Sequence, residues 1–194
     1  MNFLAHLWLA EQARLPLAGA ILGDTLHGAL PPDMPAALAA SVRLHRRIDA
    51  LTDRHPRVRA ARGRFRAGPR RYAGIVIDIV FDHVLARDWA GYSDEPLAGF
   101  AARTAAAVAG DGAWFERAGQ PAPRAAPFAA LLVSYGGEAG IERALRRTAE
   151  RLRRPEGMIE AMADWRGHLP QLGSDLPAVL EDLRAAGNEN VCRR

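Results

Sequence analysis

Two short stretches of sequence decide the fold of this chain: LHRRIDALTDRH at residues 44–55 and IDIVFDH at residues 77–83. In both, acidic or imidazole side chains recur at every fourth position, namely His45, Asp49 and Asp53 in the first and Asp78 and Asp82 in the second. Side chains four residues apart lie one above the other on an α-helix. Stacked carboxylates repel one another unless a cation or a proton lies between them. The spacing therefore predicts two helices whose acidic side chains hold a metal ion.

The residues around these side chains are apolar. In the helix predicted from about residue 36 to 54, His45 and Asp49 share a face with apolar residues, and arginines occupy the opposite face. The stretch from about 70 to 92 is apolar almost all round, which is typical of a central, buried helix. Burying a charge costs several kcal/mol unless the charge is paired or bound to a metal. This cost favours a site at which six side chains converge: Asp24, His45, Asp49, Asp78, Asp82 and His83.

The ligand types indicate which ions the site could take. Carboxylate and imidazole ligands without a thiolate suit Mn²⁺ or Mg²⁺, and Zn²⁺ and Fe²⁺ are also compatible. The alternative is that the acids pair with arginines or cap loops. His6 is either a hydrogen-bond donor to the site or a core histidine. Asp53 either joins the site or pairs with Arg54 or Arg57. We expect His55 to cap the helix that Pro56 opens.

The rest of the chain shows helical patterns and no segment that alternates with period two. Further helices are predicted from Asn2, after Pro16, and at about 56–66, 96–108, 128–135, 141–154, 158–168 and 176–186. We predict an all-α, single-domain bundle of seven to nine helices over residues 1–194. Within it we expect a metal-site core at about 1–92, additional helices at about 93–187 and a frayed tail at 188–194.

Composition and charge limit the cellular setting. The net charge is +4 and the pI about 10.1, which favours an anionic partner. One cysteine, Cys192, excludes an internal disulfide and fits a reducing cytoplasm. No apolar run reaches the roughly 18 residues of a membrane span, so we expect neither an anchor nor a signal peptide. We therefore predict a cytoplasmic protein that has no membrane partner.

Several motifs resemble the acyl carrier protein phosphodiesterase family. They are MNFLAHLWLA (1–10), GAILGDTLHG (19–28), LHRRIDALTDRHP (44–56) and RRYAGIVIDIVFDHVLARDW (70–89), with a weaker similarity at 132–155. The resemblance implies a cytoplasmic, all-helical enzyme distantly related to the HD metal-dependent phosphohydrolases, hence an HD-domain-like fold. The implied reaction is hydrolysis of the phosphodiester that joins 4′-phosphopantetheine to a serine of acyl carrier protein. Mn²⁺ is the implied ion, with Mg²⁺ or another divalent ion as alternatives.

The resemblance assigns roles residue by residue. Three motifs carry them: the GD motif at Asp24, the HRxID motif at His45 and Asp49, and the DxxxDH motif at Asp78, Asp82 and His83. The predicted metal ligands are Asp24, His45, Asp78 and Asp82. The predicted catalytic residues are Asp24, Asp49 and His83, with His83 protonating the leaving serine alkoxide unless it is a ligand. Independently of the resemblance, Arg46 and Arg71 are predicted to bind substrate, because they flank the acid-rich segments and could hold a phosphate bidentately. The alternative for each is a solvated surface position.

The chain departs from the related patterns in two places. It has no adjacent His-Asp pair, only Asp82-His83 in the reverse order, so ligand roles in HD enzymes do not transfer directly. Thr25 and Leu26 replace an aromatic-Val pair that is usual after the first aspartate.

Two other functions fit the sequence. One is a metal phosphohydrolase that acts on nucleotides or another small phosphodiester. The other is an Arg-rich helical module that binds nucleic acid, although such a module gives no reason to place acids inside two helices. The basic stretch 143–154 is either a solvated face or a surface that steers an acidic carrier protein.

Overall fold

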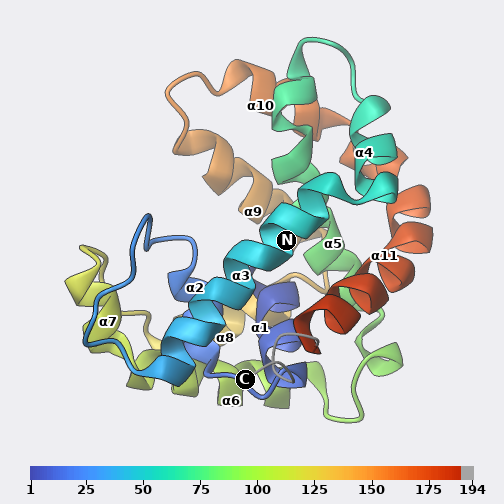
Figure 1. Ribbon diagram of the computed structural model, residues 1–194. Coiled ribbons are helices and arrows are strands. Elements are labelled where there is room, and N and C mark those ends of the chain that lie inside the picture. The colour runs from blue at the N-terminus through green and yellow to red at the C-terminus, as the bar shows by residue number, and fades with distance from the viewer. Residues whose placement is uncertain (189–194) are drawn as a thin grey trace.

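A computed structural model describes residues 1–188, and its regular elements are all helical (Figure 1). Helix α3 (Ala36–Arg54) carries the first acidic stretch and α5 (Ala73–Arg87) carries the second. Helix α1 (Phe3–Gln12) packs against both of them. The two acid-bearing helices are therefore brought to one place through the first helix of the chain. The predicted all-α class is confirmed.

The remaining helices surround this centre. They are α2 (Leu17–Leu22), α4 (Pro56–Gly63), α6 (Leu97–Gly110), α7 (Gly112–Arg117), α8 (Ala125–Ser134), α9 (Glu138–Glu150), α10 (Glu156–Ala163) and α11 (Trp165–Asn188), with 3₁₀ turns at Pro69–Tyr72 and Trp89–Gly91. The described residues thus contain eleven α-helices, more than the predicted seven to nine. Cys192 and the predicted tail beyond residue 188 lie outside the described residues.

Helix α11 differs from the expected pattern. We predicted separate helices at 158–168 and 176–186, but α11 is continuous through Pro170 and Pro177. An internal proline costs a helix about 3 kcal/mol. The helix offsets that cost by burying one apolar stripe against the core: Leu172, Leu176, Val179, Leu180 and Leu183. Packing therefore overrides the local breaking signals.

The core is a single cluster centred on α5. Ile77, Val80, Phe81 and Leu85 have no exposed surface, in keeping with the prediction of a central, buried helix. Helix α5 contacts α1, α4, α9, α10 and α11. None of the described helices combines the length and the apolarity that crossing a membrane requires.

Two close backbone approaches fix α2 against α3. A β-carbon at Gly19 would lie 2.4 Å from Cβ of Ser41, and one at Gly23 would lie 2.2 Å from the ring of His45. The two glycines are four residues apart, as are Ser41 and His45, so they form matching positions on the two elements. Helix α2 ends at Leu22 with Gly23 as its C-cap, which puts Asp24 in the turn beside α3.

Candidate metal centre and its cleft

Three side chains from α1 and α3 bring ligand atoms together. These atoms of His6, His45 and Asp49 all lie within 4.8 Å of one another. Nε2 of His6 is 2.9 Å from one Asp49 oxygen, and Nε2 of His45 is 3.2 Å from the other. The two imidazoles stack with ring centroids 3.9 Å apart. Asp49 therefore contacts both histidines, one through each carboxylate oxygen, so the three side chains are close enough to hold one ion together.

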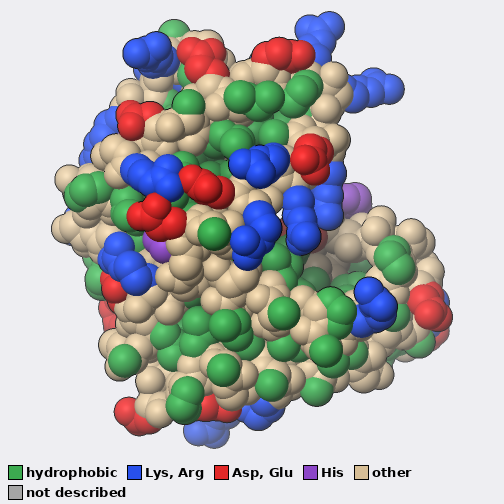
Figure 2. Space-filling view, turned by 180° about the vertical axis from the view of Figure 1, so that it is seen from behind, with side chains coloured by type: hydrophobic (Ala, Val, Ile, Leu, Met, Phe, Trp, Pro, Cys, Tyr) green, Lys and Arg blue, Asp and Glu red, His purple; other side chains and the backbone are tan. Residues whose placement is uncertain are grey.

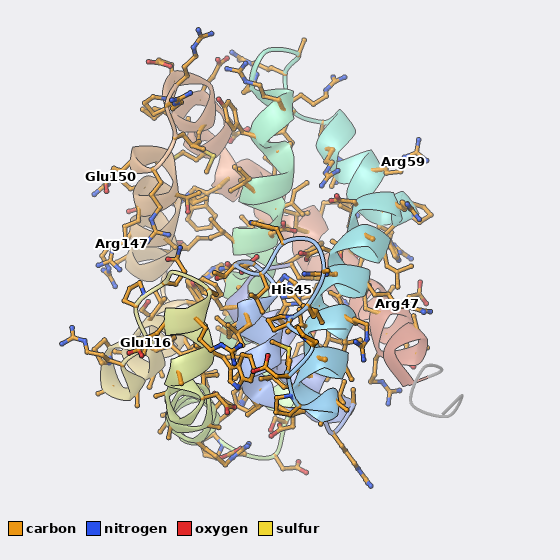
Figure 3. The ribbon with its side chains drawn as sticks, turned by 60° about the vertical axis from the view of Figure 1, so that its left-hand side comes forward. His45, Arg47, Arg59, Glu116, Arg147 and Glu150 are labelled. Carbon is orange, nitrogen blue, oxygen red and sulfur yellow. The ribbon has the colours of Figure 1, made fainter. Side chains whose placement is uncertain are left out.

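The orientation of His45 is fixed by groups on α2. Its Nδ1 donates a hydrogen bond to the carbonyl of Ala20 at 2.7 Å, and its ring lies on the backbone of Gly23. Nε2 is thereby directed at Asp49 and at Asp24, whose oxygen is 3.4 Å away. A backbone carbonyl that holds one imidazole nitrogen is the usual arrangement around a metal-binding histidine. Figure 3 shows His45 in the interior, beneath the loop that follows α2.

Charges in the cluster set unequal pKa values for the two histidines. Burial opposes protonation of His45, but its hydrogen bonds to Asp24 and Asp49 outweigh burial and raise its pKa to about 9. Burial dominates at His6 and lowers its pKa to about 4. Burial alone would raise the pKa of Asp49, yet the hydrogen bonds from His45 and His6 hold that pKa well below its ordinary value. Without an ion, the cluster therefore holds one proton between two carboxylates.

The residues present fit a divalent ion. Two imidazoles and a carboxylate are ligands of Mn²⁺, Zn²⁺ and Fe²⁺. An ion would take the place of the proton that Asp24 and Asp49 favour on His45. Nδ1 of His6 is buried and has no hydrogen-bond partner among the described residues. This nitrogen is therefore free to take a ligand, while Nε2 keeps its contact with Asp49.

Asp78 joins the cluster through the α-amino group of Met1. This nitrogen lies 3.1 Å from Asp78 Oδ1 and 3.4 Å from Asp49 Oδ1. Burial opposes its charge, but Asp78 and Asp49 outweigh burial and raise its pKa. Burial also raises the pKa of Asp78. The Met1 amino group thus links Asp78 to Asp49.

Asp82 caps helix α1. Its two oxygens accept hydrogen bonds from the backbone amides of Leu4 and Ala5 at 2.7 and 2.9 Å. The Asn2 side chain makes no cap hydrogen bond to this helix and donates instead to the hydroxyl of Tyr135. Burial raises the pKa of Asp82 to about 7 despite the two amide bonds. The acid inside the apolar helix α5 therefore satisfies the free amides of another helix.

Two further predicted site residues lie against backbone groups outside the cluster. Nδ1 of His83 donates to the carbonyl of Tyr135 at 2.6 Å, and its ring meets Trp165 edge-on. Arg46 donates to the carbonyls of Leu26 and Gly28 and so braces the loop after α2. No described contact joins either residue to the cluster.

A cleft opens beside the cluster in two lobes. One lobe has a volume of about 260 Å³ and is lined by Asp24, Tyr135, Arg147 and Arg151, among others. The other has a volume of about 420 Å³ and is lined by Asp53, Arg62, Arg70 and Arg71. Ile75 and Asp78 line both lobes, so the two meet at α5. Arg71, predicted to bind substrate, thus lies in the second lobe.

Reasoning from the sequence did not identify two contributors. His6 was left open because a lone histidine among Leu4, Leu7 and Trp8 reads equally well as a core residue. Gly23 was not selected, although its position directly before Asp24 was visible. Asp53, the other open case, pairs with Arg62 rather than with Arg54 or Arg57. His55 caps α4 as expected, since its Nδ1 accepts from the amide of Arg57.

Comparison with known proteins gives a consistent result. A sequence model of the acyl carrier protein phosphodiesterase family matches residues 1–183. Proteins named acyl carrier protein phosphodiesterase from Escherichia coli strain K12 / DH10B and from Escherichia coli O139:H28 are each 46% identical over 101 residues. These alignments cover 52% of this chain and 52% of each relative, so the chain spans about half the length of the curated relatives it matches. No solved structure gives a significant match, and the likeness to HD domains stays a prediction. The chain belongs to the acyl carrier protein phosphodiesterase family.

Proposed function

We propose that this protein hydrolyses the phosphodiester between 4′-phosphopantetheine and a serine of acyl carrier protein, and that it requires a divalent ion. The observation that carries the proposal is the cluster of His6, His45 and Asp49 beside an arginine-lined cleft. Family membership and the names of the relatives support the substrate. The products are the apo-carrier protein and the free arm.

We assign the ion to His6, His45 and Asp49, with Asp24 at the open side of the cluster. Mn²⁺ is our first choice because two imidazoles and a carboxylate suit a borderline ion better than Mg²⁺. When bound, a divalent ion lowers the pKa of water and neutralises charge on phosphoryl oxygens. In this assignment Asp82 supports the site by holding α1 in place, and Asp78 is available to the cleft.

In this proposal Asp24 activates the attacking water, and the arginines of the cleft bind the phosphate. The Asp24 side chain is 55% exposed and lines the cleft, so it can orient a water molecule and accept its proton. Arg147 and Arg151 line the same lobe, where guanidinium groups can hold the non-bridging oxygens and stabilise charge that builds up on them. Apolar side chains of this lobe, such as Phe3 and Leu131, can contact the uncharged arm.

Mass spectrometry of holo-carrier protein tests the proposal. Incubation with the enzyme and Mn²⁺ should remove the arm, and chelator should stop the reaction. Asp49→Asn should lower turnover by at least about a hundredfold, the usual effect of removing a group that holds a metal. Asp33→Asn is a matched control, since Asp33 forms an ion pair with Arg117 away from the cluster. Intact holo-carrier protein after prolonged incubation, with activity on a nucleotide panel, would favour the small-phosphodiester alternative.

A further inference from the structure

One wall of the cleft continues into a band of unneutralised positive charge. Residues 143–154 contain six arginines and one glutamate. Among the described residues, none of these six arginines forms an ion pair with a carboxylate. Several arginines elsewhere are held in such pairs, including Arg103, Arg117, Arg166 and Arg184. Six arginines with one glutamate in twelve residues make the band a local excess of positive charge.

The band runs from inside the cleft to the outer surface. Helix α9 buries its other face through Ile141 and Leu145. Arg147 and Arg151 line the cleft, whereas Arg143 and Arg146 are exposed beyond it. Figure 2 shows arginine side chains gathered at the centre of the face on which α9 runs, beside a hollow in the surface.

The chemistry of the proposed substrate demands a protein surface at this rim. The bond to be broken joins phosphorus to a serine oxygen, so the scissile atoms lie one side chain away from the body of the carrier protein. That body must therefore contact the rim of the cleft while the arm extends inward. Opposite charges across such a contact speed association and fix its orientation.

We propose that the exposed face of α9, which carries Arg143 and Arg146, is the docking surface for a negatively charged face of the carrier protein. This inference rests on the proposed function. In the docked complex the serine-linked phosphate lies between Arg147 and Arg151, and Arg143 and Arg146 pair with carboxylates beside the serine. The α9 arginines outside the cleft serve recognition of the protein and have no part in the chemistry.

Charge reversal on α9 tests the inference against a matched control. The test variant is Arg143→Glu/Arg146→Glu. The control is Arg43→Glu/Arg59→Glu, which changes two exposed, unpaired arginines on α3 and α4 by the same charge. Figure 3 places Arg59 on the opposite side of the molecule from Arg147. Two readouts are needed: the affinity for apo-carrier protein by fluorescence anisotropy, and the hydrolysis of bis(p-nitrophenyl) phosphate.

We expect the α9 variant to bind apo-carrier protein at least about tenfold more weakly, with a flatter salt dependence. Its hydrolysis of the small diester and its helical circular dichroism should match the wild type, and the control should bind normally. Equal losses of affinity for apo-carrier protein in both variants would show that only net charge matters. They would overturn the proposal that α9 is the docking surface. Binding to apo-carrier protein does not depend on chemistry. A wild type that binds through α9 but leaves holo-carrier protein intact would therefore refute the proposed function alone.

Discussion

The ring of His45 lies on the backbone of Gly23, where an added β-carbon would be 2.2 Å from its Cγ. This contact allows Nε2 of His45 to reach Asp24 and Asp49 at once. Gly23, the residue directly before Asp24, is therefore part of the architecture of the cluster, although it has no side chain.

Replacing this glycine should displace His45. We predict that Gly23→Ala costs about 1–3 kcal/mol of stability, as overpacking a filled site does, and lowers turnover and Mn²⁺ affinity at least about tenfold. Urea denaturation and metal titration measure both effects. Gly63→Ala is the control, because nothing lies within 4 Å of the added carbon. Normal metal affinity in Gly23→Ala would show that the contact does not position His45.

The raised pKa of His45 predicts a pH dependence of stability without metal. The folded state binds the His45 proton more tightly than the unfolded chain, with a pKa of about 9 against 6.5. The resulting stabilisation is full below pH 6.5 and is lost as the pH rises through 9, with an upper limit of about 3 kcal/mol. The α-amino group of Met1, whose pKa is also raised, acts in the same direction above pH 8.

Urea midpoints at pH 6.5 and 9.5, measured in the presence of chelator, check this prediction. The urea midpoint should fall between the two pH values in the wild type, and it should fall clearly less in His45→Gln. Glutamine keeps a side chain of similar length that does not titrate in this range. Parallel declines in the two proteins would mean that His45 is not the group responsible.

Metal addition should stabilise the protein in a way that depends on the cluster. An ion at 100 times its dissociation constant contributes about 2.7 kcal/mol, seen as a higher Tm. The stabilisation should grow from pH 6.5 toward 9, because the ion competes with the His45 proton. It should disappear in His6→Ala and Asp49→Asn. A Tm rise that persists in Asp49→Asn would place the ion elsewhere.

Asp82 should matter for stability more than for metal affinity. Asp82→Ala leaves two buried amides at the start of α1 without acceptors, a loss of about 2–4 kcal/mol. Asp82→Asn should fall in between, because an amide side chain keeps one acceptor for the two donors. Thermal denaturation together with isothermal titration separates the effects. A folded Asp82→Ala protein that no longer binds Mn²⁺ would instead make Asp82 a ligand.

Local signals predicted the helical framework well. Helix α3 was predicted over its observed span, and His55 caps α4 through a bond to an amide two residues away. The four-residue spacing of His45 and Asp49 placed both on one face, where they meet Asp24. The span of α3, the cap on α4 and the shared face of His45 and Asp49 depend on neighbours within a few turns of the chain, so the pattern of residue types contains them. The contact with Asp24 does not.

Contacts between segments that are distant in the sequence could not be predicted from the spacing of residue types. The sequence predicts that Asp82 is buried. A buried aspartate can be a metal ligand or a cap for another helix, so burial alone does not show that Asp82 caps α1. Arg46 lies beside the acidic stretch in sequence, yet it donates to carbonyls of the loop after α2. His6 joins His45 only because α1 packs against α3. Such contacts are determined by how the helices pack together, and this packing cannot be inferred from the residues of one segment alone.

The cap on α1 also sets an order of events during synthesis. Isolated helices of about ten residues are marginal in water, and the acceptor for the first amides of α1 comes from a residue 78 positions later than Leu4. Helix α1 thus becomes firm only after the later helix α5 has been made. Because His6 lies on α1, the cluster of His6, His45 and Asp49 depends on a residue that is translated well after all three of its members.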